Sequence, residues 1–284
     1  MTRIVLTGGT GYLGAAALAQ FVAGGHAVTA LVRNDEAAAK VRKAGAEAAV
    51  GDLFDVAWAA ERFAAGDAVV HLAATGDAEG ARFDRAIASA AAQALGGTDK
   101  PYVHTSGVWI WGSNPDITEE SPLAPPALTA WRLEVEAAVL DSGLNATILA
   151  PGIVYGHGGG IPAGVLAPAR DEAGRVRLVG DGTQHWTPVH VDDVAALYRL
   201  VVERGEALGR LLAVSGTNLT VREIAEAASA GAGVAPETAD ESRARLSGPF
   251  ADALLLDQQA SGARARSLGW TPSGPSLLDE LRAA

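Results

Sequence analysis

The chain has 284 residues, of which 49% are hydrophobic, and 33 acidic against 22 basic side chains give a net charge of −11. This length suffices for one large α/β domain, or for a domain with a smaller lobe. The acidic balance, without a block of Lys and Arg, argues against nucleic acid as a partner. The absence of cysteine excludes disulfides, thiolate metal sites and a cysteine nucleophile.

The N-terminus enters an apolar run without a basic-then-hydrophobic leader, and no apolar run approaches the length of a membrane span. We therefore expect a cytoplasmic protein that has no membrane partner. No metal site is expected either, because the adjacent acids Asp192 and Asp193 cannot share one face of a helix.

Along the first half of the chain, short β-like runs alternate with alanine-rich helical stretches. Strands are predicted over residues 3–7, 27–32, 46–50, 68–72, 101–105 and 145–149. Helices are predicted over residues 12–23, 35–44, 55–64, 79–95 and 128–140. Strands separated by helices of this length imply βαβ units and a parallel sheet, and right-handed connections favour a doubly wound arrangement.

The alternation breaks after Pro151, where "GIVYGHGGGIPAG" is typical of a glycine-rich loop. A short strand, a turn at "GDGT" and a helix from Val191 should follow. A later helix should be capped by Thr220, with Glu223 three residues on. We predict a dinucleotide-binding domain over residues 1–151, and a smaller substrate lobe over residues 152–284 with segments that return to the main sheet.

The stretch "RIVLTGGTGYLGAAALAQF" places a glycine-rich turn between the first strand and the first helix. Gly9, Gly11 and Gly14 satisfy the pattern G-x-G-x-x-G. Glycines permit a tight turn and a close approach to a pyrophosphate, to which the helix N-terminus offers N–H groups and a positive dipole end. The predicted cofactor-binding residues of this segment are Thr7, Gly8, Gly9, Thr10, Gly11, Tyr12, Leu13 and Gly14.

The ends of the next strands extend the predicted cofactor site. The second strand ends at Arg33, whereas a carboxylate there would bind the ribose 2′-hydroxyl of NAD. Arginine suits the 2′-phosphate of NADP, and Asn34 could assist it. Asp35 and Glu36 suit the first turn of the following helix. NADP (NADPH) is therefore the expected cofactor, with NAD as the alternative. Further cofactor contacts are predicted for Asp52, Leu53, Ala73 and Ala74.

Together these segments resemble the short-chain dehydrogenase/reductase superfamily, in its extended or atypical branch of epimerase/dehydratase-like proteins. The matching motifs are TGGTGYLG, GDL, HLAA, YVHTSGVWIWG, PGIVYG and VHVDDVA, in the family's order along the chain. The resemblance implies an α/β Rossmann-type sheet with a smaller C-terminal substrate lobe, a nicotinamide cofactor and, by family habit, a homodimer. It adds cofactor contacts from Thr105, Arg132, Pro151, Gly152 and Val154.

Family members protonate the alkoxide with a tyrosine, and a lysine lies one helical turn later. Alignment of "TAWRLEVE" with that helix puts Arg132 on the lysine and Leu128 on the tyrosine, so the motif is degenerate. Arginine could hold the nicotinamide ribose, but leucine donates no proton; simple packing of this helix is the alternative. The family serine falls on Gly107, which leaves Ser106 as the predicted polarising residue and turn capping as its alternative. Tyr155 is the tyrosine expected to face the cleft, with packing as the competing interpretation.

Nucleotide-sugar members of the family usually carry an arginine before "VHVDDVA", where this chain reads His185-Trp186-Thr187. That departure favours a small, mostly apolar organic molecule as the partner. The predicted substrate contacts, each with core packing or structural hydrogen bonding as its alternative, are Trp109, Trp111, His157, His185 and Trp186.

The favoured hypothesis is an NADPH-dependent reductase acting on a ketone, an imine or an activated alkene. Its proton would come from a non-standard residue or from water. The first alternative is a non-catalytic NADP-binding sensor or scaffold. The second is a lyase, isomerase or cyclase that binds the cofactor but carries out acid–base chemistry. Net consumption of NADPH distinguishes the first hypothesis from the other two.

Overall fold

The computed structural model describes residues 1–166 and 168–283. The chain divides into two compact units, each built from separate stretches of sequence. Unit 1 comprises Met1–Ser106, Trp131–Leu149 and Val194–Leu211. Unit 2 comprises Gly107–Ala130, Ala150–Asp193 and the chain from Leu212 onward. The chain thus passes between the units more often than a single boundary at residue 151 implies.

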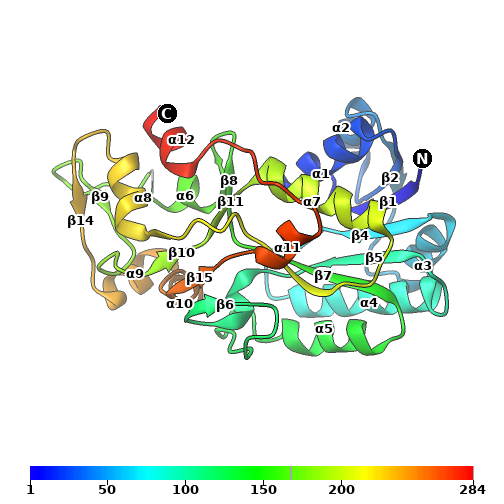
Figure 1. Ribbon diagram of the computed structural model, residues 1–284. Coiled ribbons are helices and arrows are strands. Elements are labelled where there is room, and N and C mark those ends of the chain that lie inside the picture. The colour runs from blue at the N-terminus through cyan, green and yellow to red at the C-terminus, as the bar shows by residue number, and fades with distance from the viewer. Residues whose placement is uncertain (167, 284) are drawn as a thin grey trace. The chain divides into compact units, whose positions relative to one another are not determined.

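Unit 1 is organised around a seven-stranded sheet with the order β12-β7-β5-β4-β1-β2-β3 (Figure 1). Neighbouring strands from β7 to β3 pair in parallel. The order reverses between β1 and β4, as in a Rossmann-type doubly wound sheet, so the predicted fold class is confirmed. The strands are β1 (Arg3–Thr7), β2 (Ala27–Val32), β3 (Glu47–Val50), β4 (Ala68–His71), β5 (Pro101–Thr105), β7 (Asn145–Pro151) and β12 (Gly209–Ala213).

Helices connect these strands, and four of the predicted ones begin and end within one residue of their observed bounds. The fifth prediction was wrong at its start, because residues 127–131 form turns, with the Thr129 N–H bonded to the Pro126 carbonyl. The helices are α1 (Tyr12–Ala23), α2 (Asp35–Lys43), α3 (Val56–Ala65), α4 (Gly80–Leu95), α5 (Arg132–Asp141) and α7 (Val191–Arg204).

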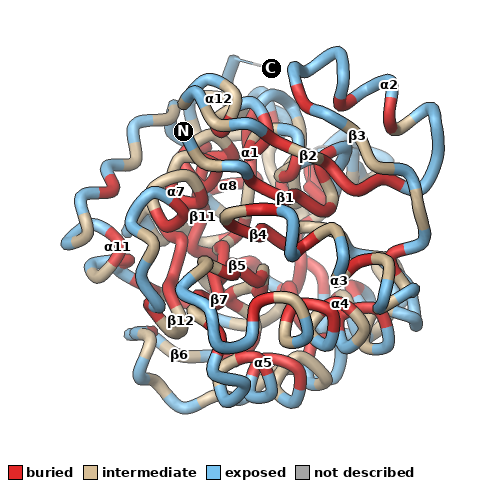
Figure 2. The backbone as a smooth tube through the Cα atoms, turned by 90° about the vertical axis from the view of Figure 1, so that its right-hand side faces the viewer, coloured by how far each residue is buried: buried red, intermediate tan, exposed pale blue. Residues whose placement is uncertain are grey.

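The core of unit 1 lies along the central strands. β4 is buried at all four positions, and β1 is buried from Ile4 onward (Figure 2). Such runs, buried on both faces, are typical of parallel strands covered by helices. Phe63 of α3 and Ile87 of α4 belong to the same hydrophobic cluster as Val69 of β4. This packing fixes the carboxyl ends of the strands, where the predicted cofactor residues lie.

Unit 2 is built from short strand pairs and short helices. Three pairs are parallel, namely β8 (Ile153–Gly156) with β11 (Pro188–His190), β6 (Asn114–Ile117) with β15 (Gln258–Ala260), and β9 (Val176–Arg177) with β14 (Val234–Ala235). β10 (His185–Trp186) pairs antiparallel with β13 (Leu219–Thr220). The helices are η1 (Val108–Trp111), α6 (Gly160–Val165), α8 (Val221–Ala228), α9 (Ala239–Leu246), α10 (Gly248–Leu254), α11 (Ala263–Ser267) and α12 (Leu277–Ala283).

Two local predictions for unit 2 can be compared with the structure. The loop expected over "GIVYGHGGGIPAG" was wrong, because the segment contains β8 and α6. The capped helix was correct: Thr220 accepts from the Glu223 N–H, and the Glu223 carboxylate accepts from the Thr220 N–H. Across the described part of the chain, no helix combines the length and the apolar character that a bilayer crossing requires.

Candidate nicotinamide-cofactor and catalytic site

The glycine-rich loop of unit 1 is packed so tightly that side chains are excluded at two positions. Gly8 has φ +78°, and a Cβ there would lie 2.5 Å from the backbone nitrogen of Ala73. A Cβ on Gly14 would lie 2.0 Å from the carbonyl oxygen of Gly8. Both separations are far below van der Waals contact. Glycine is therefore required at position 8, where the loop meets the end of β4, and at position 14, where α1 meets the loop.

The N-terminus of α1 suits an anionic group. Gly11 occupies the N-cap and offers no side chain to cap the helix, and the first turn holds no acidic residue. The positive end of the helix dipole is therefore left without a negative protein side chain beside it. Together with the side-chain-free loop, this end of α1 fits the pyrophosphate of a dinucleotide.

The end of β2 presents one basic side chain. Arg33 is exposed and makes no hydrogen bond or ion pair to any other residue that the structure describes. Asn34 caps α2 by accepting from the Ala37 N–H at 2.9 Å, so its side-chain oxygen is already used. Asp35 and Glu36 lie in the first turn of α2, as predicted. The guanidinium of Arg33 thus lacks an anionic partner among the residues that the structure describes.

The residues predicted after β3 and β4 differ in accessibility. Asp52 accepts from the Phe54 N–H at 2.9 Å and shapes the turn there. Leu53 is only 5% exposed and belongs to the core of unit 1, so the cofactor contact predicted for it needs correction. Ala73 is half-buried and Ala74 is exposed, which leaves the segment after β4 open to a ligand.

Arg132 is placed at the end of β5 by the start of α5. Its Nη1 donates to the carbonyl oxygen of Thr105 at 3.0 Å, and its guanidinium carbon lies 4.9 Å from the ring centroid of Trp131. The Thr105 hydroxyl donates to the His71 carbonyl at 2.6 Å, and the Tyr198 hydroxyl, also at 2.6 Å, donates to Thr105 in turn. A guanidinium has five N–H groups, so Arg132 retains donors for a ligand.

Ser106 follows Thr105 but is turned into the protein. It is 7% exposed, and its Oγ donates to Oε1 of Glu136 at 2.5 Å. Arg210 binds the other carboxylate oxygen of fully buried Glu136, with Nε–Oε2 at 3.0 Å. The single hydroxyl proton of Ser106 is therefore already used. This hydrogen bond argues against our prediction that Ser106 polarises a substrate carbonyl, and it gives the side chain a positioning role.

Tyr155, the tyrosine expected to face the cleft, belongs instead to the core of unit 2. Its hydroxyl donates to the Pro275 carbonyl at 2.7 Å, and the residue is 6% exposed. Burial, with the nearby acids Asp193 and Glu280, raises the pKa of Tyr155 to about 12. A phenol in this setting is a poor proton donor near neutral pH, so the predicted catalytic role is corrected to packing.

Two other tyrosines are also unsuited to proton transfer. Tyr102 and Tyr198 are fully buried, and burial raises the pKa of each hydroxyl well above its usual value. Tyr12 is 42% exposed at the first residue of α1, beside the glycine loop. Together with Tyr155 these are the four tyrosines of the chain, and none of them combines an accessible hydroxyl with a place at the end of β5.

Beneath the loop, unit 1 contains a chain of buried polar side chains that the motifs do not indicate. Thr7 Oγ1 lies 2.7 Å from His71 Nδ1, and His71 Nε2 lies 3.3 Å from Asp84 Oδ1. His104 Nε2 lies 3.6 Å from Asp84 Oδ2, and its Nδ1 lies 3.0 Å from the Tyr102 hydroxyl. Its members come from β1, β4, β5 and α4, so sequence spacing alone gives no signal for it.

The protons of this chain can be assigned from its ends. Backbone N–H groups of Leu72 and Ala73 donate to Thr7 Oγ1, so the Thr7 hydroxyl donates its own proton to His71 Nδ1. His71 Nε2 then carries the proton that faces Asp84. Burial lowers the pKa of His71, which keeps this imidazole neutral. Burial would raise the pKa of Asp84, but His104 and His71 beside it hold the value well below its usual range.

In unit 2, the predicted cofactor residues after β7 are mostly structural. Pro151 ends β7 and is buried, while Val154 pairs with Val189 of β11. The Gly152 N–H donates to the Ala213 carbonyl at 3.1 Å. A Cβ on Gly152 would lie 2.2 Å from the Thr187 carbonyl oxygen, so this glycine is required for packing within unit 2.

The aromatic residues predicted to line the substrate cleft also need correction. Trp111 and Trp186 are 1% and 2% exposed, and the Trp186 indole N–H donates to the Leu254 carbonyl. Side chains buried to this degree pack the core and offer no surface to a substrate. Trp109 is half-buried against Phe250, with ring centroids 6.1 Å apart. His185 lies 2.9 Å from Asp257 through its Nδ1. Trp109 and His185 remain candidate substrate contacts.

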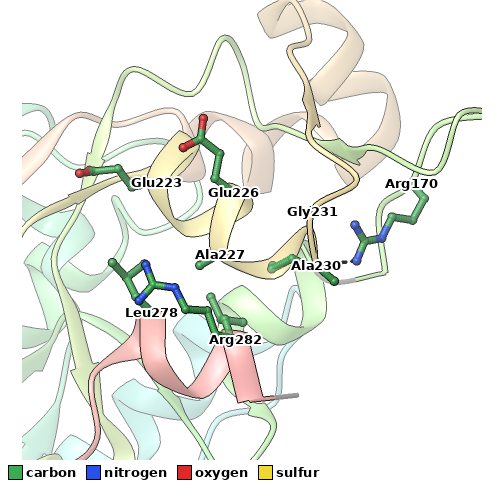
Figure 3. A pocket seen from close by; sticks show the side chains of 10 residues that line it. Arg170, Glu223, Glu226, Ala227, Ala230, Gly231, Leu278 and Arg282 are labelled. Carbon is green, nitrogen blue, oxygen red and sulfur yellow. Dashed lines mark hydrogen bonds between the residues drawn. The ribbon is translucent and has the colours of Figure 1, made fainter.

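A cavity of about 720 Å³ lies in unit 2, between α8 and α12 (Figure 3). Glu223, Glu226 and Ala227 of α8 line one side, and Leu278 and Arg282 of α12 line the other. None of the predicted substrate residues belongs to its lining.

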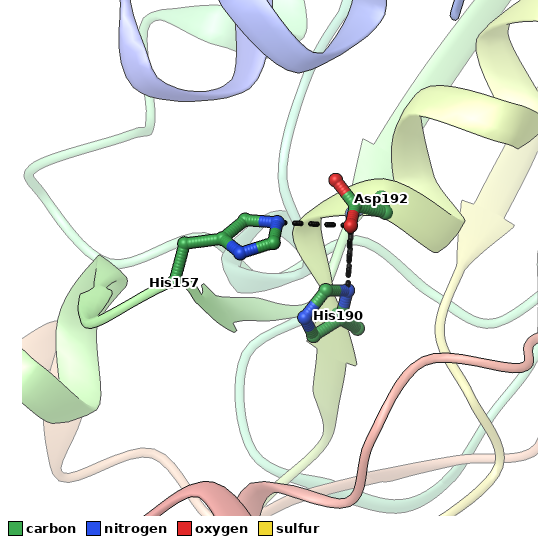
Figure 4. A group of neighbouring side chains, drawn as sticks. All are labelled: His157, His190 and Asp192. Carbon is green, nitrogen blue, oxygen red and sulfur yellow. Dashed lines mark hydrogen bonds and ion pairs between the residues drawn. The ribbon is translucent and has the colours of Figure 1, made fainter. Parts of the chain in front are cut away.

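The sequence prediction of no metal site overlooked a group that the fold brings together. His157, His190 and Asp192 converge from the segment after β8, the end of β11 and the start of α7 (Figure 4). The available signal was one histidine directly after the motif PGIVYG and a second within VHVDDVA, near a carboxylate. Their separation of more than 30 positions hid it.

Comparison with known proteins agrees with this architecture. An uncharacterized protein of Saccharomyces cerevisiae is 29% identical over 99% of this chain and 98% of its own. A 4-hydroxy-2-methyl-3-oxo-4-farnesyl-3,4-dihydroquinoline-1-oxide ketoreductase of Stigmatella aurantiaca is 29% identical over 72% of this chain and 65% of its own. The crystal structure of the human epimerase family protein SDR39U1 with NADPH is 23% identical, covers 99% of this chain and 98% of its own, and superposes with a TM-score of 0.76.

The sequence profile of one family accounts for most of the chain. It matches residues 4–212, which include the glycine loop, α5 and α7. The family combines a Rossmann-type sheet with a nicotinamide dinucleotide, in agreement with the geometry of the loop and of α1. The chain belongs to the NAD dependent epimerase/dehydratase family.

Proposed function

We propose that this protein is an NADP(H)-dependent reductase of a small, mostly apolar organic substrate that carries a ketone, an imine or an activated alkene. The observation that carries the proposal is the set of groups in unit 1: an intact glycine loop, Arg33 without an anionic partner in the described part of the chain, and Arg132 at the end of β5. The Stigmatella aurantiaca relative is a ketoreductase, which supports the reaction class.

Residues of the loop, of α1 and of β2 would hold the cofactor. The N-terminus of α1 would bind the pyrophosphate, and Arg33 would bind the 2′-phosphate through a bidentate, charge-assisted pair. The remaining donors of Arg132 would hold the nicotinamide ribose, where the family uses lysine. When bound, the nicotinamide supplies the hydride.

Arg132 would also stabilise the negative charge that develops on the substrate. Thr105 fixes the end of β5 through its bonds to His71 and Tyr198, which keeps the backbone under Arg132 in place. No tyrosine of the chain is suited to donate the proton, so we assign that step to water. Because Tyr155 is now assigned to packing, its replacement by phenylalanine tests whether water donates the proton.

The cofactor preference gives one prediction. Arg33→Ala should raise the Kd for NADPH about 10–100-fold, because a charge-assisted pair contributes about 1.5–3 kcal/mol, and should leave the Kd for NADH nearly unchanged. Calorimetric titration with both cofactors measures this difference. Arg42→Ala, which removes the same charge from an exposed position of α2, is the matched control. Equal losses for NADPH and NADH would refute the assignment of Arg33.

The reaction itself is tested by following NADPH absorbance with a panel of ketones, imines and enones. We expect turnover with at least one class and a loss of about 10²-fold in kcat/KM for Arg132→Ala, typical of removing one preorganised donor. Tyr155→Phe should keep its turnover, because the hydroxyl binds Pro275 within the core.

Each outcome of this experiment has a defined meaning. If no substrate class consumes NADPH, the reductase proposal fails. If products form without a change in absorbance, the protein is a lyase or an isomerase that uses the cofactor site. If Tyr155→Phe abolishes turnover while the fold remains intact by circular dichroism, water is not the proton donor.

A further inference from the structure

We propose that His157, His190 and Asp192 form a binding site for one divalent transition-metal ion of the Zn²⁺ type. All three residues lie within unit 2, and the candidate ligand atoms lie within 4.8 Å of one another. Two imidazoles with one carboxylate form a ligand set used by zinc and related ions. The proposal is independent of the cofactor and of the reductase activity.

The distances fit an ion between the three side chains. Asp192 Oδ2 lies 2.9 Å from His157 Nε2 and 3.8 Å from His190 Nδ1 (Figure 4). Ligand bonds of about 2.0–2.1 Å in a tetrahedral site place neighbouring donor atoms about 3.4 Å apart. The two observed distances lie on either side of that value, so small rotations of exposed side chains would complete the site.

His190 is the rigid ligand of the site. It is buried, and a Cβ added to Gly156 or to Gly274 would come within 2.5 Å of its side chain, so two glycine backbones clamp it. Its Nε2 lies 3.0 Å from a Glu280 carboxylate oxygen, and its Nδ1 accepts the backbone N–H of Asp192 at a long 3.2 Å. The ring therefore carries its proton on Nε2 and directs the Nδ1 lone pair toward Asp192.

This arrangement has the outer contacts of a metal-binding histidine. Histidine ligands commonly donate their second N–H to a carboxylate, which fixes the tautomer and makes the ligating nitrogen more basic. Glu280 of α12 occupies that position here. A metal bound at Nδ1 would replace the long contact with the Asp192 N–H and would leave the Glu280 contact in place.

His157 supplies the exposed ligand of the site, and its backbone conformation is unusual. Its backbone has φ 52°, which is unusual for a residue with a Cβ, and glycines 156 and 158 flank it. This conformation places the His157 imidazole, whose side chain is 66% exposed, beside Asp192. Its ring centroid lies 5.3 Å from that of His190. With three protein ligands, water would take the fourth position.

Calorimetric titration of the full-length, chelator-treated protein with ZnCl₂ at pH 7.5 tests the proposal. We expect one Zn²⁺ per chain, and an increase in Kd of at least 10-fold for both His157→Ala and Asp192→Asn. Glu280→Gln should raise the Kd about 10–100-fold, because it removes the carboxylate behind His190. His157 is exposed, so its replacement should leave the thermal midpoint of the metal-free protein within about 2 °C of the wild type.

The matched control is His185→Ala. His185 lies 2.9 Å from Asp257, which reproduces the imidazole–carboxylate pair without a second histidine. We expect this variant to bind Zn²⁺ as the wild type does. The proposal is overturned if the wild-type protein takes up no stoichiometric Zn²⁺, or if His157→Ala binds the ion as tightly as the wild type. It is also overturned if the affinity is lost in His185→Ala instead.

Discussion

Replacement of Asp84 by alanine should lower the free energy of unfolding by about 3–5 kcal/mol, the usual result of removing one partner from a buried charged network. The Asp84 carboxylate accepts from His71 and faces His104, and all three side chains are buried. Without Asp84, two imidazole N–H groups lose their acceptor in a place that water does not reach. Urea denaturation followed by circular dichroism measures the change.

The surface ion pair of Asp67 with Arg3 provides the control. The two side chains are 41% and 64% exposed, so Asp67→Ala should cost about 1 kcal/mol or less. Asp84→Asn keeps one acceptor and should fall between the two alanine variants. If Asp84→Ala is no less stable than Asp67→Ala, the buried chain does not contribute to stability as argued.

The pH dependence follows from the directions of two pKa shifts. The pKa of Asp84 is lowered in the folded state, so the unfolded chain binds more protons, and stability is lost as the pH falls below about 5. The pKa of His71 is lowered by burial, so protonation of the unfolded chain costs further stability below about pH 6.5. The wild-type protein should therefore unfold more easily in acid, and Asp84→Ala should lose the step that belongs to the carboxylate.

The same buried chain connects stability to the cofactor site. Thr7 is its last member and directly precedes Gly8 of the loop. Thr7 Oγ1 also accepts from the backbone N–H groups of Leu72 and Ala73, which follow β4. One hydroxyl thus holds the end of β4 against the loop, so the position of the segment that is open to a ligand depends on the core.

Six of the seven strands of the sheet in unit 1 could be predicted because their signals are local, whereas β12 was missed. Each predicted strand is an apolar run, and α2 and α3 begin after the capping residues Asn34 and Asp55. The glycine loop could also be predicted, because the spacing of its glycines reflects contacts between segments that are neighbours in the sequence. The turn over residues 8–11, between β1 and α1, was therefore predicted correctly.

The errors arise where partners lie far apart in sequence. β8 is stabilised by pairing with β11, more than 30 residues later in the chain. The glycines of this segment favoured a loop in the sequence prediction, because the local sequence does not show the pairing partner. Ser106 was assigned to chemistry because nothing nearby in the sequence shows that its hydroxyl donates to Glu136, which is itself bound by Arg210. The tryptophans were placed in a cleft because side-chain type does not reveal burial, which is decided by tertiary packing.

The start of α5 shows a related limit. Ala127, Leu128 and Ala130 are good helix formers, and they favoured a helix from residue 128. The bond from the Thr129 N–H to the Pro126 carbonyl forms a turn instead, and α5 begins at Arg132. Leu128, at the position of the family tyrosine, is 36% exposed and lies outside the helix. The residue that stands in place of the family tyrosine thus lies in a turn before α5.

Gly14→Ala should lower the free energy of unfolding by at least about 2 kcal/mol and should also weaken cofactor binding. The added Cβ would lie 2.0 Å from the Gly8 carbonyl oxygen, and a backbone oxygen cannot move away by rotation of a side chain. Helix propensity points the other way, since alanine within a helix is favoured over glycine by about 1 kcal/mol. A loss of stability therefore reports the packing of α1 on the loop.

Gly11→Ala separates this packing from contact with the ligand. A Cβ on Gly11 would lie 3.3 Å from the same Gly8 oxygen, so the neighbour need yield by only a few tenths of an ångström. Stability should stay within about 1 kcal/mol of the wild type, whereas the affinity for NADPH should fall, because this second glycine of the pattern lets the backbone approach the pyrophosphate. Urea denaturation and NADPH titration of both variants give the four values needed. Equal stability of Gly14→Ala and the wild type would mean that the loop and α1 can move apart without cost. Unchanged NADPH affinity in Gly11→Ala would place the pyrophosphate elsewhere on unit 1.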